Sequence, residues 1–127
     1  MSSASKQWTE QARYDLDTAR AMFGSGRYLY VLFCCQQAVE KALKAFIVRQ
    51  TNDLPPRLHN LLRLAEIAGI KMEPDREEFL GELSGYYIQT RYPEEIKSLA
   101  QTPEREIAQE ALDKTGEVIE WLFSMLK

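Results

Sequence analysis

The feature that most constrains this chain is a stretch from Arg27 to Gln50 that contains neither glycine nor proline. Such a stretch predicts one uninterrupted helix, about 36 Å long at 1.5 Å per residue. Most of the helical wheel is apolar, and an apolar arc this wide indicates either the central helix of a bundle or a helix shared between the core and a dimer interface. The polar side chains share a single arc of roughly 140°, and they are Gln36, Gln37, Glu40, Lys41 and Lys44.

Apolar residues at steps of three and four predict further amphipathic helices on both sides of this stretch. The helix before it is expected from Ser5 to Phe23, ended by the glycines at 24 and 26. A proline-containing loop at 51–58 then precedes three more expected helices, at 59–68, from 74 to about 91 and from 102 to about 125. No strand pattern is present. The sequence therefore predicts one all-α domain over residues 1–127, an up-and-down helical bundle of about five helices.

Local start signals set the boundaries of the later helices. Asp75 is expected to cap the helix that begins at 74, because an acid follows three residues later, as in a capping box. This helix should end near Arg91, ahead of a proline, and the polar segment 94–101 is expected to be a loop or a single turn. Thr102 and Pro103 then supply an N-cap and a first helical residue for the last helix.

Charge and composition exclude several classes of function. With 16 Lys and Arg against 19 Asp and Glu, the net charge is −3, which argues against a duplex-DNA binder. The single histidine and the adjacent Cys34 and Cys35 supply no zinc ligand set, and the Glu-x-x-His pairs of a di-iron bundle are absent. No metal or other cofactor is expected. Neither a signal peptide nor a membrane-spanning stretch is recognisable, so we expect a cytoplasmic protein with no membrane partner.

The polar arc of the long helix has two interpretations. It is either a solvated face, on which Glu40 and Lys44 form an i,i+4 ion pair, or part of an anion site. In the second case Lys41 and Lys44 bind a phosphate at the edge of a groove, beside glutamine donors such as Gln37. The spacing of the residues is compatible with both.

An aromatic segment near the end of the helix expected from 74 also has two interpretations. Tyr86 and Tyr87 either cover the core, with Arg91 at the negative end of the helix dipole, or form a platform on which a base stacks while Arg91 holds a phosphate. Tyr92 adds a third aromatic ring to this segment.

His59 is the only histidine and lies two residues after Arg57. At the start of a helix it is either a capping or packing residue or a general acid or base. No glycine-rich phosphate loop, nucleophile elbow or specific pair of carboxylates accompanies it. We therefore assign no catalytic residue.

Three motifs together resemble those of one known family. The run QQAVEKALKA at 36–45 is the most specific of them, and LHNL at 58–61 and RYP at 91–93 follow at supporting distances. These motifs, and the chain over roughly residues 7–126, resemble the HEPN domain, a helical module named for nucleotide binding in higher eukaryotes and prokaryotes. The resemblance implies an up-and-down bundle that commonly forms homodimers.

The resemblance also implies a choice of functions. HEPN proteins occur alone, fused to larger proteins, or beside a minimal nucleotidyltransferase in toxin–antitoxin-like pairs. Many are metal-independent ribonucleases that use an arginine followed a few residues later by a histidine. No histidine follows Arg91, so the resemblance does not imply that this chain has the ribonuclease activity of those members. The resemblance favours a homodimeric, non-catalytic module that binds a nucleotide or a nucleotidyltransferase partner.

In a HEPN-like bundle the long helix and the RYP segment can border one groove, which would join Lys41, Lys44, Tyr87 and Arg91 into one site. The alternative is a ribonuclease with an atypical centre, in which His59 or Tyr92 replaces the missing histidine. The expected nucleotide or phosphate site consists of Gln37, Lys41, Lys44, Tyr87, Arg91 and Tyr92, with Arg57 and His59 as secondary candidates.

Overall fold

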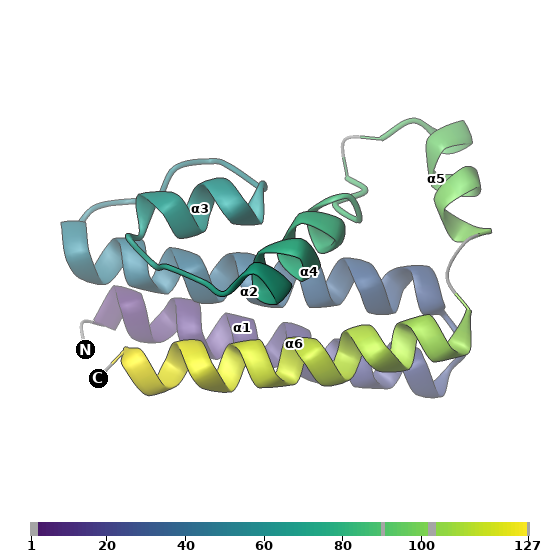
Figure 1. Cartoon of the computed structure of the whole chain (residues 1–127), viewed down its shortest axis with the longest axis horizontal. Helices are drawn as coiled ribbons and strands as arrows, with labels where there is room; N and C mark the ends of the chain where they lie inside the picture. Colours follow the sequence, from purple (N-terminus) through teal and green to yellow (C-terminus); the bar gives the residue numbers. More distant parts are fainter. Residues whose placement is uncertain (1–2, 90, 102–103, 127) are drawn as a thin grey trace.

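Six helices and no strand make up the described part of the chain, residues 3–89, 91–101 and 104–126 of a computed structural model. The all-α bundle is confirmed, with one helix more than expected. In chain order the helices are α1 (Ser3–Gly24), α2 (Tyr28–Thr51), α3 (Leu61–Ile67), α4 (Pro74–Ser84), α5 (Pro93–Ala100) and α6 (Arg105–Met125) (Figure 1).

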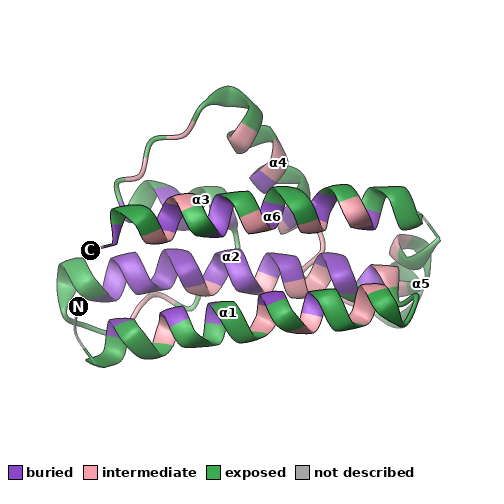
Figure 2. Ribbon diagram, turned by 90° about the horizontal axis from the view of Figure 1, so that it is seen from below, coloured by how far each residue is buried: buried purple, intermediate pink, exposed green. Residues whose placement is uncertain are grey.

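Helix α2 is the central helix, because it contacts each of the other five. Helices α1 and α6 lie along it, while the shorter α3 and α4 cover another side (Figure 1). Figure 2 shows α2 buried over most of its length between α1 and α6, whose outer faces are exposed. Every residue from Ala42 to Val48 is buried. The wide apolar arc is thus used within one chain, and the homodimer stays a prediction.

The first helix packs on α2 through the face that its periodicity predicts. Ala12, Leu16 and Ala19 are buried in the core, and Trp8 and Phe23 pack partly buried at its two ends. The turn to α2 needs a glycine, because Gly26 has a φ of +73°, a conformation that L side chains rarely adopt.

The predicted helix from 74 to about 91 begins where expected, at Pro74, but its N-cap and its end differ from the prediction. Pro74 is the first helical residue and Glu73 is the N-cap, so Asp75 lies within the first turn and does not cap it. Proline suits this position since its φ is preset and its missing N–H needs no partner. At the other end α4 stops at Ser84, because Arg91 donates to the backbone oxygens of Gly85 and Tyr87 and stabilises a non-helical connection.

The segment expected to be a loop or single turn at 94–101 forms α5 instead. Pro93 is its first residue, and acids in the first turn and Lys97 in the last suit the helix dipole. Its N-terminus is closed by Tyr92, whose backbone N–H donates to Glu95 Oε1 at 3.4 Å.

Two other helix starts differ from the expected positions. Helix α3 begins at Leu61, two residues after His59, with Asn60 as its N-cap. The proposed start of the last helix at Thr102 and Pro103 lies outside the described residues, and α6 begins at Arg105 after Glu104.

Shortening the Leu43 side chain on the central helix should destabilise the whole bundle. Leu43 is fully buried, so we expect Leu43→Ala to lower the free energy of unfolding by about 2–5 kcal/mol. Leu54→Ala is the matched control, because Leu54 is 87% exposed, and should change it by less than about 0.5 kcal/mol. Urea denaturation followed by circular dichroism measures both, and equal effects would contradict the central position of α2.

Candidate functional site

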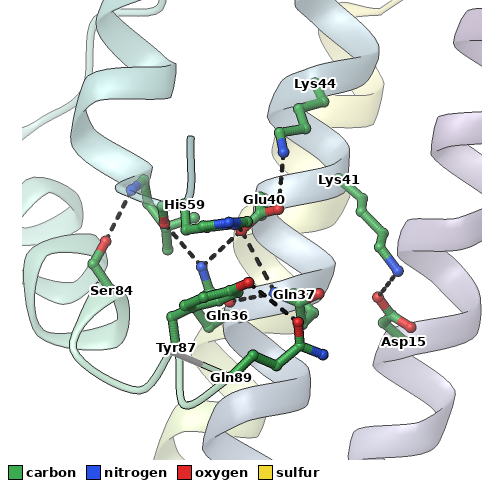
Figure 3. A network of polar contacts seen from close by, with 11 residues as sticks. Asp15, Gln36, Gln37, Glu40, Lys41, Lys44, His59, Ser84, Tyr87 and Gln89 are labelled. Carbon is green, nitrogen blue, oxygen red and sulfur yellow. Dashed lines mark hydrogen bonds and ion pairs between the residues drawn. The ribbon is translucent and has the colours of Figure 1, made fainter. Parts of the chain in front are cut away.

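A buried carboxylate on α2 organises the polar side chains of the bundle. Glu40 is only 4% exposed, and its two oxygens are shared among four side chains, of which Gln37 is the most distant, with its Nε2 3.5 Å from Oε1 (Figure 3). Oε1 accepts from His59 Nδ1 at 2.9 Å and from Gln36 Nε2 at 3.1 Å, while Oε2 accepts from Lys44 Nζ at 3.0 Å. Gln36 Nε2 also donates to the backbone oxygen of His59 at 2.9 Å. Side chains of α2 therefore hold His59, in the segment before α3, by both the side chain and the backbone of that histidine.

The solvated-face interpretation of the polar arc is wrong for its middle. The i,i+4 pair of Glu40 and Lys44 exists, but both side chains are buried, as is Gln36. Lys44 Nζ also lies 5.8 Å from the ring centroid of Trp8 on α1. Lys41 points to the α1 side, where its Nζ pairs with Asp15 Oδ2 at 2.7 Å. The two lysines are thus engaged by carboxylates within the bundle.

His59 is held between Glu40 and an aromatic ring. Its imidazole stacks on Tyr87 with centroids 3.8 Å apart and planes 11° from parallel, and Nδ1 is bonded to Glu40. Among the described residues Nε2 has no hydrogen bond, which makes it the nitrogen that a ligand can use. Burial, and next the negative charge of Glu40, raise the pKa of Tyr87. The Tyr87 hydroxyl donates to Gln89 Oε1 at 3.1 Å.

Arg91 is anchored beside this stack by three contacts. Nη2 donates to the backbone oxygen of Gly85 at 2.8 Å and Nε to that of Tyr87 at 3.3 Å, while Nη1 pairs with Glu95 at 3.2 Å. A guanidinium has five N–H donors, so these three contacts leave capacity for an anion. The Arg91 side chain remains one-third exposed.

These residues line one open pocket of about 390 Å³, formed by His59, Asn60, Ser84, Tyr87, Arg91 and Glu95. Ser84 Oγ accepts from the Leu61 backbone N–H at 2.9 Å, which fixes the end of α4 against the start of α3. The Asn60 side chain caps α3 by accepting from the Arg63 N–H at 3.1 Å. The pocket thus combines two stacked rings, a guanidinium and helix-terminal polar groups.

The structure brings only part of the expected site together. Tyr87, Arg91 and the secondary candidate His59 share the pocket, but Lys41 and Lys44 do not line it. Figure 3 shows Lys41 directed to Asp15, with His59 and Tyr87 on the other side of Glu40. The remaining candidates stand apart from the lining: Gln37 donates to Gln36 Oε1 at 2.7 Å, Tyr92 is 73% exposed, and Arg57 is exposed in the loop before α3.

The residues that sequence reasoning missed are Asn60, Ser84 and Glu95, together with the role of Glu40. An asparagine directly before an apolar run is an N-cap signal, so Asn60 could have been found. Ser84 and Glu95 carry no local signal, because their place in the pocket depends on how α4 ends and where α5 begins.

The two cysteines behave as packing residues. Burial raises the pKa of Cys34 to about 11 and that of Cys35 to about 12, so both are thiols at neutral pH.

Within residues 3–89, 91–101 and 104–126, no group of three or more His, Cys, Asp or Glu is arranged to hold a metal ion. Over the same ranges, no helix combines the length and apolar character needed to cross a membrane.

Comparison with known proteins identifies the class to which this bundle belongs. The family model for the HEPN domain matches residues 5–126, so the chain belongs to the HEPN domain family. TT1696 from Thermus thermophilus is a solved structure with 30% identity and a TM-score of 0.79, covering 94% of this chain and 96% of its own. ST0689, an archaeal HEPN homologue, shares the fold at 22% identity and a TM-score of 0.75, with 97% and 98% covered. A search of curated proteins gave no match.

Removing the charge of Glu40 should be far more costly than removing an exposed carboxylate. Glu40→Gln leaves Lys44 charged and buried without its partner, so we expect a loss of about 3–5 kcal/mol in the free energy of unfolding. Glu120→Gln is the control, because its pair with Arg13 is exposed on both sides, and should cost less than about 1 kcal/mol. Urea denaturation at neutral pH measures both. Similar losses in the two variants would contradict the buried ion pair.

Proposed function

We propose that this HEPN protein is a nucleotide-binding module without catalytic activity, and that the nucleotide binds in the pocket of His59, Tyr87 and Arg91. The observation that carries the proposal is the pairing of two stacked rings with an anchored guanidinium in one open pocket. Aromatic faces bind bases by stacking, and a planar guanidinium binds phosphate through two parallel N–H donors.

The positions of Lys41 and Lys44 exclude both lysines from the proposed phosphate-binding residues. Lys41 and Lys44 are paired with Asp15 and Glu40 and do not line the pocket. Arg91, which lines it, is therefore the cation that supplies the phosphate contact in this proposal, through the donors that its pair with Glu95 leaves free. Its orientation is fixed before ligand arrives, because two backbone oxygens and Glu95 hold it. Preorganisation of this kind lowers the entropy cost of binding.

Calorimetric titration with ATP, GTP and a short RNA tests the proposal. We expect saturable binding that Arg91→Ala weakens about tenfold, or about 1.4 kcal/mol, because the variant loses the phosphate contact. Arg63→Ala is the matched control, since Arg63 forms an exposed pair with Glu66 on α3 outside the pocket, and should bind like the unmodified protein. Circular dichroism checks that both variants are folded. Binding that is absent, or equally weak in both variants, refutes the proposal.

A second candidate function is metal-independent ribonuclease activity, favoured by the hydrogen bond between Glu40 and His59 Nδ1. A carboxylate that fixes one ring nitrogen leaves the other oriented as a general base or acid. Arg91 in the same pocket could then stabilise the charge of the phosphate in the transition state. Here His59, not a residue after Arg91, takes the place of the missing histidine.

Incubation of a fluorophore-labelled RNA with the protein in EDTA separates the two functions. The binding proposal expects no cleavage above background, because no side chain then acts as a base. The ribonuclease alternative expects cleavage that falls by about 100-fold or more in His59→Gln and is lost in Arg91→Ala, while Arg63→Ala cleaves normally. That the protein has a nucleotidyltransferase partner stays a prediction from the family. Co-expression of the two proteins followed by co-purification tests it.

A further inference from the structure

A groove between α4 and α6 lies apart from the nucleotide pocket. It consists of two adjoining hollows of about 440 and 490 Å³ that share Phe79, Glu82, Glu110 and Lys114. Long side chains bridge it: the Arg76 guanidinium carbon lies 4.1 Å from the ring centroid of Trp121, and Lys114 Nζ lies 5.6 Å from that of Phe79. Such flexible cationic side chains can swing aside, so the hollow between the two helices is accessible to a ligand.

The floor of the groove is apolar. It is lined by Leu32, Phe79, Leu83, Tyr86, Ile107 and Ala111. Three of these are core residues, but Phe79 and Tyr86 are only partly covered and Ile107 is 43% exposed. A partly exposed apolar floor between two helices is the geometry in which an amphipathic helix buries its apolar face.

The rim of the groove is acidic. Five carboxylates line it, namely Asp75, Glu78, Glu82, Glu110 and Glu117, against the two cations Arg76 and Lys114. Lys114 already pairs with Glu110 at 2.8 Å. That hydrogen bond, with further attraction from Glu82 and Asp75, raises the pKa of Lys114. The field in the groove is therefore negative even around its own lysine.

We propose that the α4–α6 groove docks a basic amphipathic helix of a partner protein. Aliphatic side chains of the partner enter the floor near Ile107 and Tyr86, and its lysines or arginines face Glu82 and Glu110. Charge complementarity selects such a partner over a second copy of this chain. The chain has a net charge of −3, and pairing groove to groove about a two-fold axis would place two acidic rims against each other.

This docking surface is independent of the proposed nucleotide site, although both involve the end of α4. Tyr86 lines the groove and the next residue, Tyr87, lines the nucleotide pocket. A partner helix in the groove therefore leaves His59 and Arg91 open, so the two proposals can fail separately.

Fluorescence anisotropy with designed helical peptides tests the docking proposal on the full chain. The probe is a labelled peptide of about 18 residues, five turns, with leucines on one face and lysines beside them. We expect it to bind saturably, and about tenfold more tightly than the same peptide with glutamate in place of lysine. A peptide that keeps its lysines but has serine in place of leucine should bind about tenfold more weakly, because it cannot use the floor.

Matched variants locate the binding on the protein. Glu82→Lys should weaken the basic peptide about tenfold, whereas Glu10→Lys, which changes another exposed helical glutamate, on α1, should not. Ile107→Ser should weaken it, whereas Ile67→Ser, at 38% exposed on α3, should not. Absence of binding, no preference for the basic peptide, or equal effects in the paired variants overturns the proposal. A dimer that Ile107→Ser converts to a monomer in light scattering also overturns it, because a second copy would then cover the groove.

Discussion

The carboxylate of Glu40, buried on the central helix, is the interaction on which the polar architecture of this protein depends. A buried charge is tolerated only when its oxygens are paired, since desolvation of each ion costs several kcal/mol. Glu40 meets this requirement through Lys44, Gln36 and His59. The last of these comes from the loop before α3, so the requirement also fixes where that loop crosses α2.

This constraint links the core to the proposed ligand pocket. Nδ1 of His59 is hydrogen-bonded to Glu40, and the imidazole ring stacks on Tyr87. The buried carboxylate therefore fixes the orientation of both rings that line the pocket. Arg91 adds a second anchor, since it replaces the helical hydrogen bonds that would have continued α4. The early end of α4 is therefore what brings Tyr87 and Arg91 to His59. Tyr86 and Tyr87, which follow the end of α4, line the α4–α6 groove and the nucleotide pocket respectively, so adjacent residues contribute to two surfaces.

Much of the fold could be predicted because its signals are local. The absence of glycine and proline predicted the central helix, and the spacing of apolar residues predicted the buried face of α1. The glycine at 26 predicted the turn between the two helices. The errors lie where two local signals compete. Polar composition at 94–101 favoured a loop, but the proline and acids at the start of α5 favoured a helix and prevailed. At 85–91 the chain carried an apparent helical stripe, but contacts of Arg91 with the backbone ended the helix.

The sequence by itself determined the helical class, the central position of the long helix and the HEPN family motifs, because periodicity and breakers act within a few residues. Only the tertiary structure decided that Gln36, Glu40 and Lys44 of the polar arc are buried. It also decided that Lys41 and Lys44 are paired with carboxylates and that His59 shares a pocket with Arg91. Whether a polar side chain on a helix faces water or a partner depends on which other helices cover it. That depends on residues distant in the chain, so the pattern of one helix cannot supply it.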